Sequence, residues 1–368
     1  MNLVYRLLSG CILTGITFSG LLQTPVYIKA QEPIIDQLKV KDQKLLVSKN
    51  ESLKKISRPR SLRLRFSPDG KVLASANEDG TISLWNVNDQ QCKIVKAHKA
   101  LVSDLVFSHD GKFLVSASWD GTVKFWNLQG KALKTLDFQN NNNSLSEYEA
   151  LLGNEHSINS ISLSLDDQLL ALYTRDGNSG LRSIDGKLLQ QFSGKGFPGG
   201  LILFSPDGKT LAIDNNITTI ELRNLDGKII KTLVGHQAAI SEFAFSSDGK
   251  TIVSAGFDGT VRIWTLEGQE LQTLKWTEAD PDHAWVIAVS ISPDGKMVAA
   301  PMGMVRLWNS QGQELRRFPI ESPPAMTTKV MFSPDNQSIV IGDELGRINL
   351  WNLDGSKIKA FDSSQCTH

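Results

Sequence analysis

Phe66-Ser67-Pro68-Asp69-Gly70 decides the fold, because close variants of this stretch return six more times along the chain. The seven copies begin at Phe66, Phe107, Leu163, Phe204, Phe245, Ile291 and Phe332. Four of the six intervals are 41 residues long, and the other two, of 56 and 46 residues, carry insertions. A near-constant period of this length indicates a repeat architecture in which each copy forms one structural unit.

Each copy predicts four short strands joined by tight turns. In the copy over 236–276, apolar and β-branched residues concentrate in the segments 240–245, 251–255, 261–264 and 271–274. Asp248-Gly249 predicts a turn after the first segment, since aspartate binds nearby backbone amides and glycine accepts a positive φ. Asp258-Gly259 predicts a hairpin after the second segment. One such sheet cannot cover both of its faces, so we expect seven sheets to stack around a ring.

The order of these turns and strands carries a family resemblance. Phe245-Ser-Ser-Asp-Gly249 followed by Asp258-Gly-Thr-Val-Arg-Ile-Trp264 resembles the repeat of the WD-repeat β-propellers. The resemblance covers residues 61–362 and leaves a C-terminal tail over 363–368. It implies an all-β, seven-bladed WD-repeat β-propeller with four antiparallel strands per blade. It also implies a monomeric, non-enzymatic scaffold for protein–protein interaction that needs no cofactor.

The family's hydrogen-bonded tetrad of His, Ser, Asp and Trp matches two copies of the repeat. The matching residues are His98, Ser116, Asp120 and Trp126 in the second copy and His236, Ser254, Asp258 and Trp264 in the fifth. Both sets have offsets of 18, 22 and 28 residues from the histidine. A buried imidazole, hydroxyl, carboxylate and indole N–H can satisfy one another, so each set is expected to stiffen its blade.

The other five copies keep only part of the tetrad. The first copy retains Ser75, Asp79 and Trp85 but has serine where histidine is expected. The third and fourth copies place Arg182 and Arg223 at the tryptophan position. A hydrolytic His-Ser-Asp site is disfavoured, because the set recurs at structural spacing and no G-x-S-x-G motif is present.

Charge and cysteine content argue against two kinds of site. Among 368 residues, Lys and Arg number 39 and Asp and Glu number 39, so no broad basic surface is available and nucleic acid is not an expected partner. The three cysteines are Cys11, Cys92 and Cys366, and none has zinc-binding spacing. No metal site is expected.

Residues 1–30 resemble a secretory signal peptide, since Arg6 precedes an apolar run and a short polar stretch follows. We expect cleavage near Ala30 and a periplasmic or secreted protein. The alternatives are an uncleaved N-terminal anchor and a lipoprotein acylated at Cys11, and only these would attach the chain to a membrane. Residues 31–60 carry no repeat and are expected to tether the propeller, with an added strand at the closure as the alternative.

Cys92 and Cys366 lie near the two ends of the repeat array, which a ring would make neighbours. In an oxidising compartment they could form a disulfide. However, the two cysteines are expected at opposite ends of their outer strands, and the tail after Phe361 spans only roughly 16 Å at about 3.3 Å per residue. The sequence therefore favours free thiols, with the disulfide as the alternative.

Candidate partner-binding residues follow from the repeat register. In a propeller, the hairpin between the second and third strands lies on the same face as the loop that enters the first strand. Residues at these two places are therefore expected to be exposed around the mouth of the central channel. The candidates are Glu78, Trp119, Arg175, Phe257, Trp285, Met326 and Glu344. Exposed aromatic residues and methionine on one rim are typical of a protein-binding surface, and packing onto neighbouring loops is the alternative.

Both insertions enter this same face. The longer, 139–155, predicts a short amphipathic helix that begins near Ser144, with an irregular loop as the alternative. A second possible function is a small-ligand or catalytic site in the central channel. It depends on Glu78 and Glu344, which the repeat register places in adjacent blades across the closure of the ring.

Overall fold

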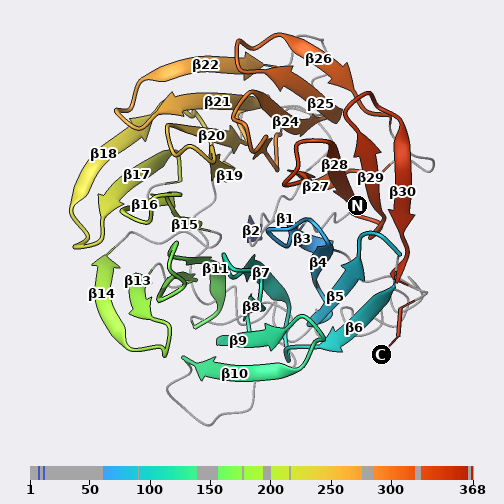
Figure 1. Ribbon diagram of the computed structural model, residues 1–368. Coiled ribbons are helices and arrows are strands. Elements are labelled where there is room, and N and C mark those ends of the chain that lie inside the picture. The colour runs from blue at the N-terminus through green and yellow to red at the C-terminus, as the bar shows by residue number, and fades with distance from the viewer. Residues whose placement is uncertain are drawn as a thin grey trace, which may run out of the picture.

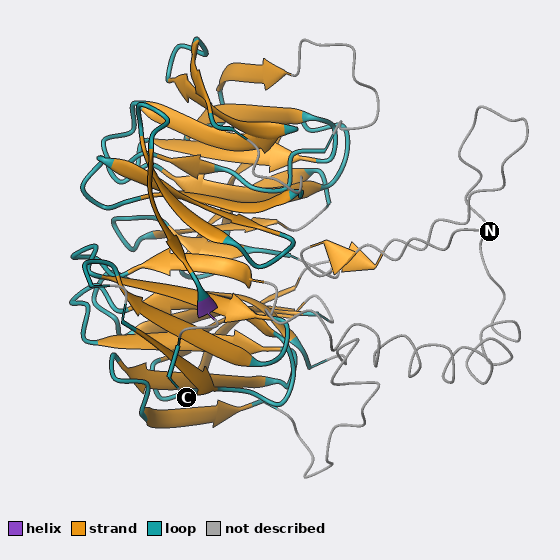
Figure 2. Ribbon diagram, turned by 90° about the vertical axis from the view of Figure 1, so that its right-hand side faces the viewer, coloured by secondary structure: helices purple, strands orange, loops and turns teal. Residues whose placement is uncertain are grey.

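The computed structural model is a ring of seven four-stranded antiparallel sheets (Figure 1). It describes residues 7–8, 11–12, 61–89, 91–138, 156–175, 178–193, 200–214, 217–275, 285–319, 325–363 and 366–367. In each sheet, or blade, the strands follow one another outward from the central axis. From the side, the strands run between the two faces of the ring, where the loops gather (Figure 2). The predicted seven-bladed all-β propeller is confirmed.

The strand bounds follow the repeat. Blade one contains β3 (Ser61–Phe66), β4 (Val72–Asn77), β5 (Thr81–Asn86) and β6 (Cys92–Lys96). Blade two contains β7 (Val102–Phe107), β8 (Phe113–Ser118), β9 (Thr122–Asn127) and β10 (Ala132–Asp137). Blade three contains β11 (Ile158–Leu163), β12 (Leu169–Thr174), β13 (Asn178–Ser183) and β14 (Leu188–Ser193). Blade four contains β15 (Ile202–Phe204), β16 (Thr210–Asp214), β17 (Thr219–Asn224) and β18 (Ile229–Val234).

The remaining blades repeat the same order. Blade five contains β19 (Ile240–Phe245), β20 (Thr251–Gly256), β21 (Thr260–Thr265) and β22 (Glu270–Lys275). Blade six contains β23 (Ser290–Ile291), β24 (Met297–Met302), β25 (Met304–Asn309) and β26 (Glu314–Arg317). Blade seven contains β27 (Thr327–Phe332), β28 (Ser338–Asp343), β29 (Ile348–Asn352) and β30 (Lys357–Phe361). A separate pair is formed by β1 (Leu7–Leu8) and β2 (Cys11–Ile12).

The recurring Ser-Pro-Asp-Gly phrase forms the turn between the first and second strands of a blade. In blade one, Ser67 Oγ donates to Asp69 Oδ1 at 2.7 Å, and the same oxygen accepts the amide of Lys71 at 3.1 Å. Gly70 has a φ of +69°, the left-handed conformation that glycine adopts without a Cβ clash. Asn336, which replaces this glycine in blade seven, adopts a φ of +61°. The phrase is therefore a structural turn.

The hydrophobic core lies between neighbouring blades. Ile82 and Leu84 of blade one pack with Leu105 and Leu114 of blade two, and all four are buried. Equivalent clusters recur around the ring, so each blade contributes apolar side chains to two interfaces. A blade is thus stabilised by its neighbours, which makes closure of the ring important for stability.

In the described part of the chain β30 completes blade seven, so blade seven meets blade one without strand exchange. The tail beyond β30 then runs beside β6: the amide of Ile94 donates to the carbonyl of Thr367 at 2.8 Å, and the amide of Thr367 donates to the carbonyl of Cys92 at 3.1 Å. The rings of Trp85 and Phe361, one from each blade, lie 5.8 Å apart. The tail therefore pairs with the outer edge of blade one through an isolated parallel β-bridge.

Cys92 and Cys366 form a disulfide, with their Cα atoms 4.7 Å apart. The prediction of free thiols is wrong. It assumed that the tail could not reach Cys92, which begins β6, whereas the bridge between Lys93 and Thr367 brings the tail alongside this end of the strand. The two ends of the repeat array are covalently joined.

Several predictions fall outside the described residues. These are the signal peptide or anchor over most of 1–30, the tether over 31–60 and the two insertions over 139–155 and 277–281. Among the described residues, no helix is long and apolar enough to cross a membrane. The processing and placement of the N-terminal segment stay predictions.

Candidate functional site

Backbone hydrogen bonds join the two places that were predicted to share one face, the hairpin between the second and third strands and the loop that enters the first strand. The amide of Arg175 donates to the carbonyl of Ser157 at 2.8 Å, and that of Phe257 donates to the carbonyl of Ala239 at 2.8 Å. In blade seven the amide of Glu344 donates to the carbonyl of Met326 at 3.0 Å. In each case a residue of the hairpin between the second and third strands contacts the entry to the first strand. We call this face of the ring the rim.

Phe257 and Trp285 form an aromatic pair on the rim, between blades five and six. Their ring centroids are 5.7 Å apart in an edge-to-face arrangement. Trp285 is 44% exposed, and it is the only tryptophan among the large hydrophobic residues that are exposed in the described part of the chain. Phe257 is half-buried beneath it. An edge-to-face partner holds the indole of Trp285 in place while leaving much of its surface open.

Trp119 differs from the expectation of an exposed rim residue, because its side chain is buried and only 2% of the residue is accessible. The guanidinium of Arg175 lies 5.5 Å from the centroid of its indole ring, a cation–π contact. Ser157 Oγ also donates to the backbone carbonyl of Trp119 at 2.9 Å. Contacts with the next blade thus replace exposure at this position, as the alternative of packing on a neighbouring loop allowed.

The remaining candidates are half-buried. Glu344 Oε1 accepts the backbone amide of Met326 at 3.1 Å, so this carboxylate supports the local loop. Glu78 lies on the corresponding hairpin of blade one. Binding by any of the seven candidate residues stays a prediction, and among them Trp285 offers the largest exposed apolar surface.

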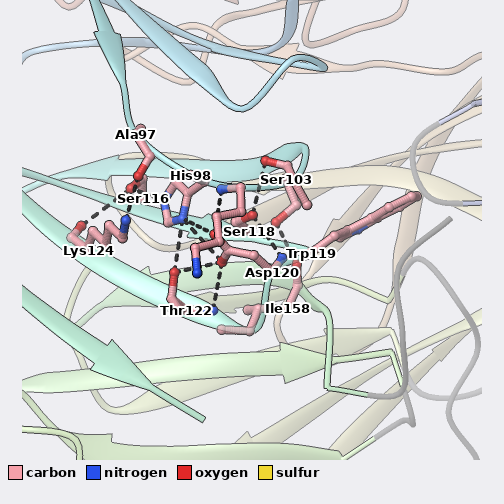
Figure 3. A network of polar contacts seen from close by, with 12 residues as sticks. Ala97, His98, Ser103, Ser116, Ser118, Trp119, Asp120, Thr122, Lys124 and Ile158 are labelled. Atoms are coloured by element: carbon pink, nitrogen blue, oxygen red, sulfur yellow. Dashed lines mark hydrogen bonds and ion pairs between the residues drawn. The ribbon is translucent and has the colours of Figure 1, made fainter. Parts of the chain in front are cut away.

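The two tetrads form the hydrogen-bond chains that their spacing predicts, and Figure 3 shows His98, Ser116 and Asp120 of the blade two chain. In blade two, Trp126 Nε1 donates to Ser116 Oγ at 2.9 Å, Ser116 Oγ lies 2.7 Å from His98 Nε2, and His98 Nδ1 lies 3.1 Å from Asp120 Oδ2. In blade five the corresponding distances, beginning at Trp264, are 2.8, 2.7 and 3.0 Å. Each chain of hydrogen bonds runs from the tryptophan near the end of the third strand to the aspartate in the hairpin on the rim.

The electrostatics of the blade two tetrad fit a structural role. Burial lowers the pKa of His98, so the imidazole is neutral at pH 7, accepts from Ser116 and donates to Asp120. Burial opposes ionisation of Asp120, but hydrogen bonds from His98, Thr122 and the Lys99 amide outweigh it and hold the pKa of this carboxyl well below its ordinary value. Ser116 Oγ accepts a hydrogen bond from the indole N–H and donates one to the histidine, so this hydroxyl is occupied by structural hydrogen bonds.

Blade one lacks the histidine, and Trp85 Nε1 is buried there without a hydrogen-bond partner. Trp85 and Trp264 are equally buried, at 2% accessibility. We therefore expect Trp264→Phe to lower the free energy of unfolding by about 1–2 kcal/mol more than Trp85→Phe, because only the first removes a satisfied hydrogen bond. Equilibrium urea unfolding of the two variants measures the difference, and equal losses would contradict it.

The central axis holds a cluster of charges that was not predicted, which we call the channel cluster. It consists of Arg63, Arg65, Asp104, Glu242 and Lys329, from the innermost strands of blades one, two, five and seven. Arg65 Nη2 lies 3.1 Å from Asp104, and Arg63 Nη1 lies 3.7 Å from Glu242. Lys329 pairs directly with Glu242.

The channel cluster is internally paired and mostly buried. Asp104 also accepts Ser160 Oγ at 3.1 Å, and Glu242 accepts the amide of Val289 at 3.1 Å. Burial, together with the charges of Arg63 and Arg65, lowers the pKa of Lys329 well below its ordinary value. No group of three or more His, Cys, Asp or Glu side chains in the described residues could hold a metal ion. The cluster therefore joins blades across the axis.

The sequence contained a signal for this cluster. Arg63, Asp104, Glu242 and Lys329 all stand three residues before the start of a Phe-Ser-Pro-Asp-Gly copy. In each of these strands a shift of the β register, a bulge, lies directly before the charged residue. Because a bulge re-aims the side chains beside it, simple strand alternation does not predict their direction.

Comparison with known proteins agrees with this architecture. Residues 57–86, 89–127 and 227–265 match the family model described as WD domain, G-beta repeat. Each of the last two segments contains one intact tetrad. A comparison with curated proteins gives no match. Over these three segments the chain is similar to WD40 repeats, and the structure is a seven-bladed β-propeller; WD40-repeat propellers commonly act as protein-interaction scaffolds and are mostly non-catalytic.

Proposed function

We propose that this propeller is an exported, non-enzymatic scaffold that binds a protein partner through its rim. The observation that carries the proposal is the pair Phe257 and Trp285, with Trp285 44% exposed on the rim. Tryptophan is enriched among the residues that dominate binding energy in protein interfaces. An indole held by an aromatic neighbour loses little conformational entropy on binding, which favours affinity.

Two further features support an interaction role over a catalytic one. The His-Ser-Asp sets are engaged in structural hydrogen-bond chains in both blades that contain them. The charged groups on the axis are paired with one another. Among the described residues, the exposed aromatic side chain of Trp285 lies on the rim.

The disulfide between Cys92 and Cys366 supports export, because disulfides persist in oxidising compartments such as the periplasm and the extracellular space. We propose removal of residues 1–30 as a signal peptide, giving a periplasmic or secreted protein. N-terminal sequencing of the mature protein should begin near Gln31. A chain that starts at Met1, or an acylated chain that starts at Cys11, would replace this proposal with a membrane-attached protein.

Partner capture by two variants tests whether the rim is the binding surface. Trp285→Ala should reduce capture of a partner from envelope extract at least about 10-fold, since truncating an interface hot spot costs about 2 kcal/mol or more. Leu271→Ala is the matched control, because Leu271 is 48% exposed but lies on the outer strand of blade five. Capture that Trp285→Ala retains, or that Leu271→Ala loses equally, would count against the rim.

A further inference from the structure

Blade three has a cavity where the tetrad has been lost. Its volume is about 160 Å³, and its lining includes Gly180, Arg182 and Leu172. Arg182 stands at the tryptophan position, and Leu172 stands at the serine position of the tetrad. Gly180 has no side chain to fill this face of blade three, and the guanidinium of Arg182 lies 4.6 Å from the ring centroid of Phe138 at the interface with blade two.

Arg182 is a cation without a carboxylate. Its Nη1 donates to the carbonyl of Gly186 at 3.1 Å, while its Nε is buried and has no hydrogen-bond partner. No ion pair involves Arg182 among the described residues. Burial lowers the pKa of its guanidinium, and no acidic group offsets this. A half-buried guanidinium without a carboxylate partner is costly, so this site lacks the counter-ion that the charge favours.

In blade four the arginine at the tryptophan position has a carboxylate partner. Arg223 also stands at the tryptophan position, and its Nη1 donates to the carbonyl of Gly227 at 3.0 Å. Its Nε and Nη2, however, donate to Glu221 Oε2 at 2.8 and 2.5 Å. Glu221 lies two residues before Arg223, and the residue two before Arg182 is Gly180. Blade three therefore has the arginine and the space, and lacks the carboxylate.

In blades five and six the fourth strand carries a glutamate, which pairs there with an arginine two residues before Trp264 or Trp308, at the position of Gly180 and not of Arg182. Arg262 pairs with Glu270 at 2.5 Å, and Arg306 pairs with Glu314 at 3.0 Å. The equivalent fourth-strand residue of blade three is Leu188, which pairs with Arg182 across the sheet as Glu270 pairs with Trp264. Neither source of a carboxylate is present in blade three.

We propose that the cavity of blade three binds a small carboxylate, which takes the place at Arg182 that Glu221 occupies at Arg223. A guanidinium binds a carboxylate through two N–H donors, and Arg182 lines the cavity with its Nε unpartnered. Thr174 and Ser179 line the same cavity as polar side chains, and Leu172 and Leu188 give it an apolar wall. A cavity of about 150 Å³ can hold a benzene ring, so a carboxylate with a short carbon chain fits.

Thermal unfolding of the full chain tests the proposal. Sodium propionate should raise the Tm of the wild-type protein by about 1–3 °C relative to propionamide with sodium chloride at equal ionic strength. Arg182→Gln should abolish this rise. A capped peptide, acetyl-Ala-Glu-Ala-amide, separates the two sources of carboxylate: a rise with propionate alone indicates a free acid, and a rise with both indicates the side chain of a polypeptide.

A second variant supplies the carboxylate from within the chain. Gly180→Glu should raise the Tm without ligand and abolish the response to propionate, as in blade four. A Cβ at Gly180 would lie 3.3 Å from Leu188 Cδ1, the end of a flexible side chain, and the backbone φ of Gly180 is not in the left-handed region. The proposal is overturned if propionate leaves the wild-type Tm unchanged, or if Arg182→Gln responds as the wild type does.

Discussion

Replacing Cys92 with serine should lower the free energy of unfolding by about 2–5 kcal/mol. The disulfide joins residues 274 positions apart, and a cross-link over so long a loop removes much of the conformational freedom of the unfolded chain. It also holds the tail against β6 at the closure between blades seven and one. Because each blade is stabilised by both neighbours, opening this closure exposes one face of each of the two blades.

Equilibrium urea unfolding with and without reductant measures this effect. Cys366→Ser and the double variant should match Cys92→Ser, since all three remove the same bond, and reductant should destabilise the wild-type protein but none of these three variants. In the full chain that keeps residues 1–30, Cys11→Ser is the matched control, because Cys11 is outside the disulfide. A wild-type protein whose unfolding is unchanged by reductant would show that the hydrogen bonds of the tail suffice to close the ring.

The repeats predicted the architecture because the fold depends on a pattern that occurs seven times. Turn residues such as Asp69 and Gly70 act locally, and the structure uses them as predicted. The tetrads were equally predictable, since two copies with the same offsets leave little freedom in their assignment. Both kinds of feature are set by short-range geometry within one blade.

The features that were missed depend on contacts between blades. Trp119 is buried and Arg175 of the next blade lies over its ring, and the repeat register gives no information about such a neighbour. The disulfide required the course of a tail that belongs to no repeat. The cavity at Arg182 became visible only when its surroundings were compared with those of Arg223.

A second large effect is expected at the channel cluster, because its described residues include more basic than acidic side chains. Three cations, Arg63, Arg65 and Lys329, face two carboxylates, Asp104 and Glu242. Glu242→Gln leaves three cations with one carboxylate and should lower the free energy of unfolding by about 3–5 kcal/mol, as expected when one partner of a buried ion pair is removed. Lys329→Met leaves two cations and two carboxylates and should cost much less.

The pH dependence of the two variants separates this charge effect from a loss of packing. The pKa of Lys329 is already lowered in the wild-type protein, and in Glu242→Gln this lysine also loses its carboxylate, so its pKa in the folded state falls further below its value in the unfolded chain. Between these two values the unfolded state binds the additional proton, and stability rises with pH. Urea unfolding from pH 7 to 9.5 should therefore recover part of the stability lost in Glu242→Gln and show no such recovery in the double variant with Lys329→Met. Equal losses in the two single variants, independent of pH, would mean that the channel cluster acts by packing alone.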